Sequence, residues 1–397
     1  MKKFFSLFSV LAVFLVFAQQ GQLRKVATVG FLNVENLWDT IHSADYIDGT
    51  RDFSDPAFHR SVPVDSIKHL EVTEEYRGVW SNELLKGKKV VRYQAVSEEF
   101  TPKSGKNYNT AVYKHKLGNI SKLISELGSK YTRTAPAVVG LIEVENRQVI
   151  EDLIKEPALA KHDYGIIHYN SYDARGVDVA LIYQKRRFTP SNSLKKEVKI
   201  FNSEGKRSYT RDVLVVTGFL DNEKVAFFMN HWPSRSGGEA ASAPRRNAAA
   251  AVLKQQMDSI RALDPSTKLI AMGDFNDDPV NNSLKKVLQA VDSEKNLSEE
   301  NPYINLMYPL YKRGVASLAY QNAPNLFDQI IVSGNVLSKK VGKEYSLYKT
   351  EVYAPDYLIT KDGSWRGYPF RSWSGDKYTG GYSDHFPAFI VLQREVN

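Results

Sequence analysis

The sequence contains no cysteine in its 397 residues. This absence excludes disulfide bonds, zinc sites built on thiolates, a cysteine nucleophile and the cysteine to which a bacterial lipoprotein anchor is attached. A Walker A loop, a GxSxG nucleophile elbow and an HExxH helix are also absent from the sequence. P-loop nucleotide hydrolysis, serine esterase chemistry and zincin proteolysis therefore have no support.

Long apolar runs are absent apart from one at the N-terminus. Lys2 and Lys3 precede an apolar stretch at 4–17, and Ala18 fits the small-residue pattern of signal-peptide cleavage. This run is too short for a membrane span, and no later stretch approaches ~18 apolar residues. We therefore expect residues 1–18 to be cleaved and the mature protein to be secreted or periplasmic, with no stable membrane span.

The charge surplus is small. Removal of the leader would take away two lysines and lower the formal net charge from +8 to +6. A surplus of this size permits an anionic substrate without identifying one.

Hydrophobic residues make up 42% of the chain, which is enough to build a sizeable core. Short apolar strands alternate with helices, and this alternation predicts an α/β layered fold. The expected strands are 26–34, 137–144, 177–183, 213–219, 225–230, 269–272, 329–332 and 388–392.

Three helices are expected between these strands. One carries apolar residues at helical spacing and stops at Gly128, and a second is capped by Asn146. The third is rich in alanine, with Pro244 in its first turn. Residues between 40 and 109 show no clear period. We therefore expect a single domain over 19–397 with a long insertion at about 40–109.

The most informative stretch is LIAMGDFNDDP at 269–279, where an apolar strand runs into Asp274 and Asn276. Two residues apart at a strand end, these side chains project to the same side and can hold a water beside a phosphate. On its own the motif fits a turn equally well. Other expected strands also end in polar residues, namely Asn33, Glu35, Glu143, Asn230 and His231.

Ligands in layered α/β proteins gather at strand ends, so we expect these side chains to converge on one site. Oxygen donors dominate the set, which favours Mg²⁺, Mn²⁺ or Ca²⁺ over zinc. Asp384 beside His385 adds a base or a metal-orienting pair, and Asp328 can hold an imidazole in one tautomer. Taken singly, these residues also fit simpler roles: a turn aspartate, a half-buried histidine and a helix-start glutamate.

The order of these motifs resembles the endonuclease/exonuclease/phosphatase superfamily, to which pancreatic-type deoxyribonuclease belongs, and most closely its exported bacterial members. The segments that carry the resemblance are NVENLWD at 33–39, GLIEVEN at 140–146, RGVDVALIY at 175–183, NHWPSRSGG at 230–238, GDFND at 273–277, FDQI at 327–330 and SDHFP at 383–387. The resemblance implies an α/β (α+β) four-layer sandwich, with two packed β-sheets flanked by helices and the active site at one edge. The insertion after Asp39 departs from the compact family pattern.

The resemblance also implies a set of roles. A divalent metal, Mg²⁺ or Mn²⁺ with Ca²⁺ as an alternative, is held by Glu143 beside Asn33, Glu35 and Asp384. Asp274 orients or deprotonates the attacking water, and Asn276 supports the developing negative charge. His231 and His385 flank the phosphate, and Asp328 orients an imidazole.

The segment from 230 to 246 carries most of the expected substrate contacts. Its arginines offer guanidinium forks to phosphate, and its tryptophan offers a stacking surface for a base. The alternatives are a surface loop with solvated arginines and a tryptophan that fills the edge of the core. The expected substrate-binding residues are Arg175, Asn230, Trp232, Arg235, Arg245 and Arg246.

These features predict an exported, metal-dependent phosphodiesterase that acts as a monomer. The substrate class we expect is nucleic acid, DNA or RNA, with endonuclease action as the leading activity. A phosphatase or a sphingomyelinase-like phospholipase of the same fold, acting on a smaller phosphate ester, is the alternative. A binding protein without catalysis is a third class, and the complete set of acidic, amide and histidine positions argues against it.

Overall fold

The computed structural model describes residues 23–40, 98–171, 173, 175–201, 205, 207–337 and 341–396. Between residues 41 and 97 it describes only the short strands β2 (Tyr46–Ile47), β3 (Thr50–Arg51), β4 (His59–Pro63), β5 (Trp80–Leu85) and β6 (Lys88–Gln94). The expected signal peptide therefore lies outside the described residues, as does most of the expected insertion. No helix in the described ranges is long and apolar enough to cross a membrane.

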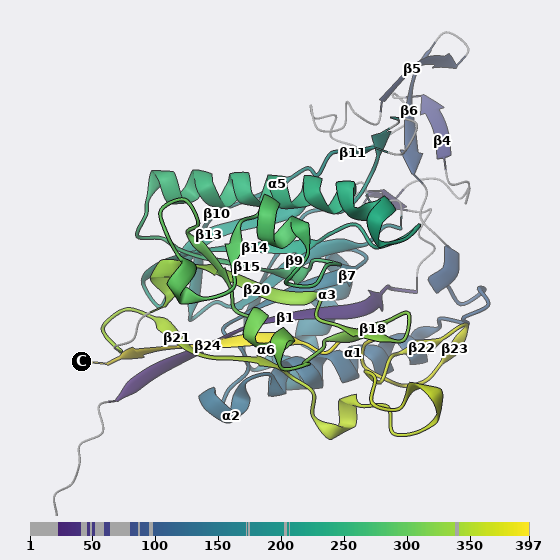
Figure 1. The fold of residues 1–397 in the computed structure, drawn as a ribbon. Coiled ribbons are helices and arrows are strands. Elements are labelled where there is room, and N and C mark those ends of the chain that lie inside the picture. Colours follow the sequence, from purple (N-terminus) through teal and green to yellow (C-terminus); the bar gives the residue numbers. More distant parts are fainter. Residues whose placement is uncertain are drawn as a thin grey trace, which may run out of the picture.

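Two mixed β-sheets form the centre of the molecule (Figure 1). The first has the order β21 (Ser346–Val352), β24 (Ala388–Glu395), β1 (Arg24–Leu37), β7 (Val138–Val144), β9 (Asp178–Gln184) and β8 (Tyr164–His168). The second has the order β10 (Phe188–Lys196), β13 (Val213–Leu220), β14 (Glu223–His231), β15 (Lys268–Asp274), β20 (Asp328–Ser333), β17 (Tyr303–Asn305) and β16 (Ala290–Val291). Every strand predicted from the sequence is present in one of these sheets.

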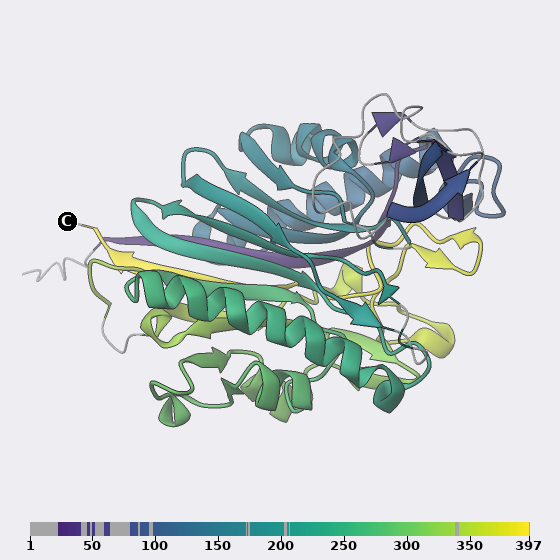
Figure 2. The ribbon, with the colours of Figure 1, turned by 90° about the horizontal axis from the view of Figure 1, so that it is seen from above.

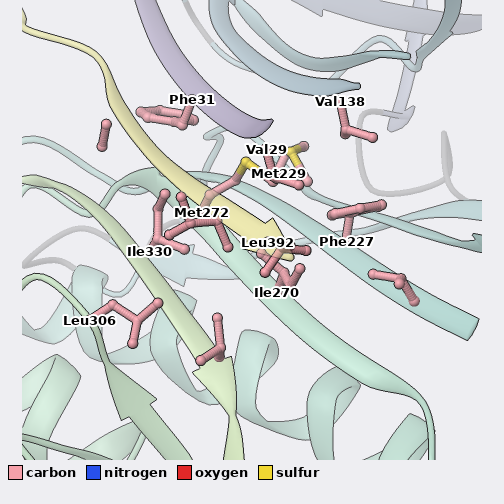
Figure 3. Packing of buried hydrophobic residues seen from close by; sticks show 14 of the residues in the cluster. Val29, Phe31, Val138, Phe227, Met229, Ile270, Met272, Leu306, Ile330 and Leu392 are labelled. Atoms are coloured by element: carbon pink, nitrogen blue, oxygen red, sulfur yellow. The ribbon is translucent and has the colours of Figure 1, made fainter. Parts of the chain in front are cut away.

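Helices cover the outer face of each sheet, as Figure 2 shows. Helices α1 (Thr110–Glu126) and α3 (Arg147–Lys155) share one apolar cluster with the first sheet, and α5 (Glu239–Leu263) shares another with the second. A third cluster fills the space between the sheets (Figure 3). Side chains of β1 alternate between two of these clusters: Phe31 faces the second sheet and Leu32 faces α1. The predicted four-layer sandwich is confirmed.

The helix boundaries confirm two sequence predictions and correct a third. Asn146 caps α3 by accepting a hydrogen bond from the Val149 amide, and Gly128 adopts a left-handed φ of 70° directly after α1. The expected start of the third helix was wrong. Helix α5 begins at Glu239, after two glycines with positive φ, and Pro244 lies inside the helix.

One edge of the sandwich gathers the ends of the central strands from both sheets. Strands β1 and β7 run parallel and end there, as do β14 and β15, while β9, β20 and β24 begin there. Gly273 allows β15 to lie close to β14, because a Cβ atom at this position would be 2.3 Å from the Asn230 carbonyl oxygen. The glycine that resembled a turn signal is thus required for strand packing beside the site.

Candidate active site

Two irregular strand ends direct acidic side chains toward this edge. The register of β1 against β7 shifts between Asn33 and Leu37, where Glu35 has a φ of 48°. The register of β7 against β9 shifts at Glu143, which has a φ of 62°. Bulges of this kind re-aim side chains beside active sites, and non-glycine residues with positive φ are strained. Regular strand pairing is therefore interrupted at the positions where the sequence predicts metal ligands.

His231 lies between two of the predicted acidic residues. Its Nε2 atom is 3.8 Å from Glu143 Oε1 and 3.9 Å from Asp274 Oδ2. Burial lowers the pKa of His231 well below its ordinary value, and the positive charges of Arg211 and Arg175 lower it further. The His231 imidazole is therefore neutral.

Asp274 is a buried carboxylate with a raised proton affinity. Burial raises its pKa to about 7, with His385 opposing the shift and the nearby carboxylates of Asp328 and Glu143 reinforcing it. The backbone amide of Asn276 donates to Asp274 Oδ1 at 2.8 Å and fixes the carboxylate orientation. A carboxylate with a pKa near neutrality is suited to accept a proton from water.

The Asn276 side chain is engaged in holding this arrangement together. Its Nδ2 donates to the Trp232 carbonyl oxygen at 2.9 Å and approaches Asp274 Oδ2 at 3.4 Å. We expected the Asn276 amide to donate a hydrogen bond to the developing charge on the substrate. This does not match the geometry, because the N–H donors of Nδ2 point to the Trp232 carbonyl oxygen and to Asp274. Asn276 is a positioning residue for Asp274.

His385 forms the closest histidine–carboxylate pair of the site. Its Nδ1 atom is 2.7 Å from Asp328 Oδ2. Burial alone would lower the pKa of His385, but the charges of Asp328, Asp384 and Asp274 outweigh it and raise the pKa well above its ordinary value. The imidazole is thus held in its protonated form, with Nε2 on the side of Asp384, 4.0 Å from Oδ1.

Glu35 and Asp384 share a partner that the sequence analysis missed. The guanidinium of Arg371 lies 3.3 Å from Glu35 Oε1 through Nε and 3.3 Å from Asp384 Oδ2 through Nη2. Glu35 is also bonded to the backbone amides of Ser372 and Trp373. Arg371 stands 13 residues before Asp384 in a loop without a recognisable pattern, so its proximity to the motif was the only available signal.

The residues fit a divalent cation at one place. No group of three or more histidine and acidic side chains in the described ranges forms a preformed metal cage. Mg²⁺, however, commonly uses one or two carboxylates and completes its shell with water and substrate oxygens. Glu143 matches that requirement, and Asn33 on the adjacent strand, whose Oδ1 accepts from the Glu35 amide at 2.8 Å, stays the predicted second ligand. A cation there would also offset the repulsion from Asp328 and Glu143, which adds to burial in raising the Asp274 pKa.

Two of the predicted substrate-binding residues belong to the core. Trp232 and Asn230 are fully buried. Trp232 Nε1 donates to Asn230 Oδ1 at 3.1 Å, and its ring packs edge-on against Phe275 with centroids 4.6 Å apart. The expected substrate contacts are wrong for these two side chains, and the alternative of a tryptophan filling the core edge is confirmed.

The arginines of the same segment divide into structural and accessible ones. Arg235 donates to the Asn276 carbonyl oxygen at 3.0 Å, and Arg246 lies 2.7 Å from Asp277 with its side chain fully buried. Burial leaves neither guanidinium a surface for a phosphate, so those two expectations are wrong. Arg245 is half-buried and donates to the Ser236 carbonyl oxygen, and its predicted substrate contact stays a prediction.

Arg175 is the predicted arginine that lies at the site itself. Its side chain is half-exposed, donates to Asn36 Oδ1 at 2.7 Å and approaches Glu143 at 3.6 Å. Arg211, which the sequence analysis did not single out, lies behind it and bonds Asp173 at 3.0 Å. Because Asp173 also accepts from the Arg175 amide, Arg211 holds the turn that presents Arg175.

Comparisons with known structures return matches at low sequence identity. An endonuclease/exonuclease/phosphatase family protein from Bacteroides thetaiotaomicron is 12% identical, with 95% of this chain and 98% of that chain covered and a TM-score of 0.48. D. rerio TDP2 complexed with single strand DNA product is 15% identical, with coverages of 70% and 92% and a TM-score of 0.45. The mannosyl-6-phosphatase Bt3783 of B. thetaiotaomicron is 15% identical, with coverages of 71% and 93% and a TM-score of 0.44.

A search of curated protein sequences finds no match to this chain. A comparison with models of protein families does find one. A model of the endonuclease/exonuclease/phosphatase family matches residues 91–394, which is well over half of the chain and contains all of the site except Asn33 and Glu35. The chain therefore belongs to the endonuclease/exonuclease/phosphatase family, whose chemistry is the hydrolysis of phosphoric esters.

Proposed function

We propose that the protein is an exported, divalent-metal-dependent phosphodiesterase with nucleic acid as its substrate. The observation that carries the chemistry is the convergence of Glu143 and Asp274 on His231, beside the His385–Asp328 pair. Export is proposed from the N-terminal sequence alone. N-terminal sequencing of the mature protein, expected to begin at Gln19, tests it.

The proposed reaction is an in-line displacement at phosphorus by water. Glu143 and Asn33 would hold the cation, which polarises a phosphoryl oxygen and offsets transition-state charge. Asp274 accepts the proton of the attacking water as the new P–O bond forms. His385 donates a hydrogen bond to the phosphate and passes a proton to the leaving alcohol as the ester bond breaks. Neutral His231, which lies between the carboxylates of Glu143 and Asp274, orients the phosphate.

A smaller phosphate ester is the second candidate substrate. The burial of Arg235 and Arg246 favours it, because it removes two of the guanidinium groups expected to follow a polyanion. Arg175 and Arg371 remain at the site, and two guanidinium groups suffice for a single phosphate.

A substrate panel with metal control tests both candidates. We expect hydrolysis of plasmid, linear DNA or RNA to stop in a chelator and to return with Mg²⁺ or Mn²⁺, and Glu143→Gln to abolish the return. Activity that persists in a chelator after metal removal would exclude the metal mechanism. Hydrolysis of a chromogenic monoester or of sphingomyelin, with nucleic acid untouched, would favour the smaller substrate.

The salt dependence of binding gives an independent answer. Binding of a polyanion releases counterions, so log K should fall with log salt by about 0.7–0.9 per neutralised phosphate. We expect a steep slope for DNA or RNA measured in Ca²⁺, provided that Ca²⁺ blocks turnover. A flat response would assign the site to a single phosphate group.

A further inference from the structure

The guanidinium of Arg371 lies between two acidic side chains that could otherwise hold a second metal ion. Its Nε and Nη2 atoms bond Glu35 and Asp384, each at 3.3 Å. One guanidinium therefore bridges carboxylates from β1 and from the segment before β24. A planar fork with fixed donor directions suits such a bridging position.

The loop that carries Arg371 is built to hold this side chain in place. Glu35 receives backbone hydrogen bonds from Ser372 and Trp373, the two residues that follow Arg371. Thr379 donates to the Arg371 carbonyl oxygen across the loop. On the inner side, fully buried Lys116 of α1 donates to Ser372 Oγ at 2.7 Å. The position of Arg371 is thus set by its neighbours before any ligand binds.

Charges around the two halves of the site differ. Beside Glu35 and Asp384 lies the Arg371 guanidinium, 3.3 Å from each carboxylate, with the buried Lys116 of α1 on the inner side. In the other half the group between the carboxylates of Glu143 and Asp274 is a histidine, at 3.8 and 3.9 Å. The half-exposed Arg175 donates to Asn36 and approaches Glu143 at 3.6 Å, and the charge of His385 acts on Asp274. Among the described residues, a guanidinium thus lies between Glu35 and Asp384, and none lies between Glu143 and Asp274.

We propose that Arg371 replaces a second metal ion, so that the protein binds one divalent cation, at Glu143, and meets the substrate phosphate with a guanidinium on the opposite side. The side chain is about half exposed, and its Nη1 has no hydrogen-bond partner among the described residues. That group presents two N–H donors to a phosphate oxygen. The inference rests on the proposed metal-dependent hydrolysis and adds the number of metals and the residue that replaces one.

Mn²⁺ binding to the intact chain, followed by the EPR signal of the free ion, tests the metal count without reference to activity. We expect one Mn²⁺ per wild-type protein, no Mn²⁺ for Glu143→Gln and one Mn²⁺ of unchanged affinity for Asp384→Asn. Two Mn²⁺ in the wild type, with one lost in Asp384→Asn, would overturn the inference and leave the proposed function intact. No Mn²⁺ in the wild type would overturn both.

The phosphate contact is tested with inorganic phosphate as the probe. Arg371→Ala should weaken phosphate binding in Mn²⁺ by about 10-fold or more, because a charge-assisted hydrogen bond is lost. Arg371→Lys should recover part of the affinity, since it restores the charge without the fork. Arg366→Ala, an exposed arginine of the same loop, is the matched control and should bind as the wild type does. Equal affinity of Arg371→Ala and wild type in a folded protein, judged by thermal melting, would refute the contact.

Discussion

The His385–Asp328 pair illustrates how single side chains set the chemistry of this site. Both groups are buried, and their 2.7 Å contact keeps the imidazole protonated although burial alone would favour the neutral ring. A protonated histidine beside the phosphate can donate both a hydrogen bond and a proton. Asp328 therefore acts through His385, as a positioning residue.

Replacing Asp328 with Asn should shift the pH dependence of the reaction. His385 works while protonated, so activity falls as pH rises through its pKa. Without the Asp328 charge that pKa is lower, so the alkaline limb of the kcat/KM profile should move to lower pH, with kcat about 100-fold down at pH 8. Asp356→Asn, on a fully exposed carboxylate, is the control. An unmoved alkaline limb would show that His385 is not the acid.

The candidate residues that follow strands could be predicted from the sequence, and those that loops bring to the same place could not. Glu143, His231 and Asp274 could be located because each ends an apolar run, and the structure brings these three together. Arg371 reaches the site only because its loop folds back onto Glu35. The burial of Arg246 could not be predicted from the sequence either. The local sequence around an arginine that follows a glycine-rich loop does not show whether the side chain faces solvent or, as here, a buried aspartate.

At the scale of elements, an ion pair anchors α5 beneath the site. Arg246 of α5 lies 2.7 Å from Asp277, three residues after Asp274 in the loop that follows β15, and both side chains are buried. Asp277 also accepts from Ser283 Oγ at 2.6 Å. Helix α5 and the loop that follows β15 are thus joined through buried groups.

Removing one member of this pair should destabilise the whole domain. Asp277→Ala leaves the Arg246 charge buried without a carboxylate, and we expect the free energy of unfolding to fall by about 3–5 kcal/mol in urea titrations. Arg245→Ala, on the neighbouring half-buried arginine, should change it by about 0.5 kcal/mol or less. A similar small loss in both variants would mean that the Asp277–Arg246 pair contributes little to stability.

Strand prediction succeeded where burial is deep and failed where it is shallow. Strands such as β7 and β15 are buried throughout, so their apolar runs stand out in the sequence. Strand β10 at the sheet edge reads FTPSNSLKK and contains a proline, and its polar outer face hides the strand pattern. The order of the strands in each sheet could not be predicted either, because strands far apart in the sequence pair, as β1 does with β24.

At the scale of the whole molecule, a clamp joins the two sheets at the end opposite the site. Asp221, in the turn between β13 and β14, accepts from Arg187 at 2.6 Å and lies 2.6 Å from Lys25 of β1. The same Arg187 guanidinium donates to the Val26 carbonyl oxygen, and Arg394 of β24 donates to the Asp221 carbonyl oxygen. One turn of the second sheet is therefore tied to two strands of the first.

This clamp should make the free energy of unfolding depend on pH in the acidic range. Burial would raise the Asp221 pKa, but hydrogen bonds from Arg187, Lys25 and Tyr345 outweigh it and lower the pKa. The stabilisation is therefore complete above the unfolded pKa of about 3.9 and is lost as pH falls through the folded value. We expect Asp221→Asn to cost about 3 kcal/mol at pH 7 and less below pH ~3 in denaturant titrations.

The control for this prediction is Asp163→Asn, an exposed carboxylate paired with Lys185 on the surface. Because both side chains are exposed to solvent, that pair should contribute little to stability at any pH. A loss in Asp221→Asn that stays constant from pH 7 to pH 3 would show that the Asp221 charge is not what joins the sheets.

The pairing of β1 with β24 makes the candidate site depend on residues that are synthesised late. The Ser383 hydroxyl donates a hydrogen bond to the Asn33 carbonyl oxygen, and the two residues are 350 positions apart in the sequence. Strand β1 therefore completes its contacts at the candidate site only after residue 383 has been synthesised. Synthesis proceeds from the N-terminus, and contacts between distant segments form late. A nascent chain that ends before residue 383 lacks His385 and the strand that closes the sheet beside β1. Such a chain therefore lacks part of the candidate site.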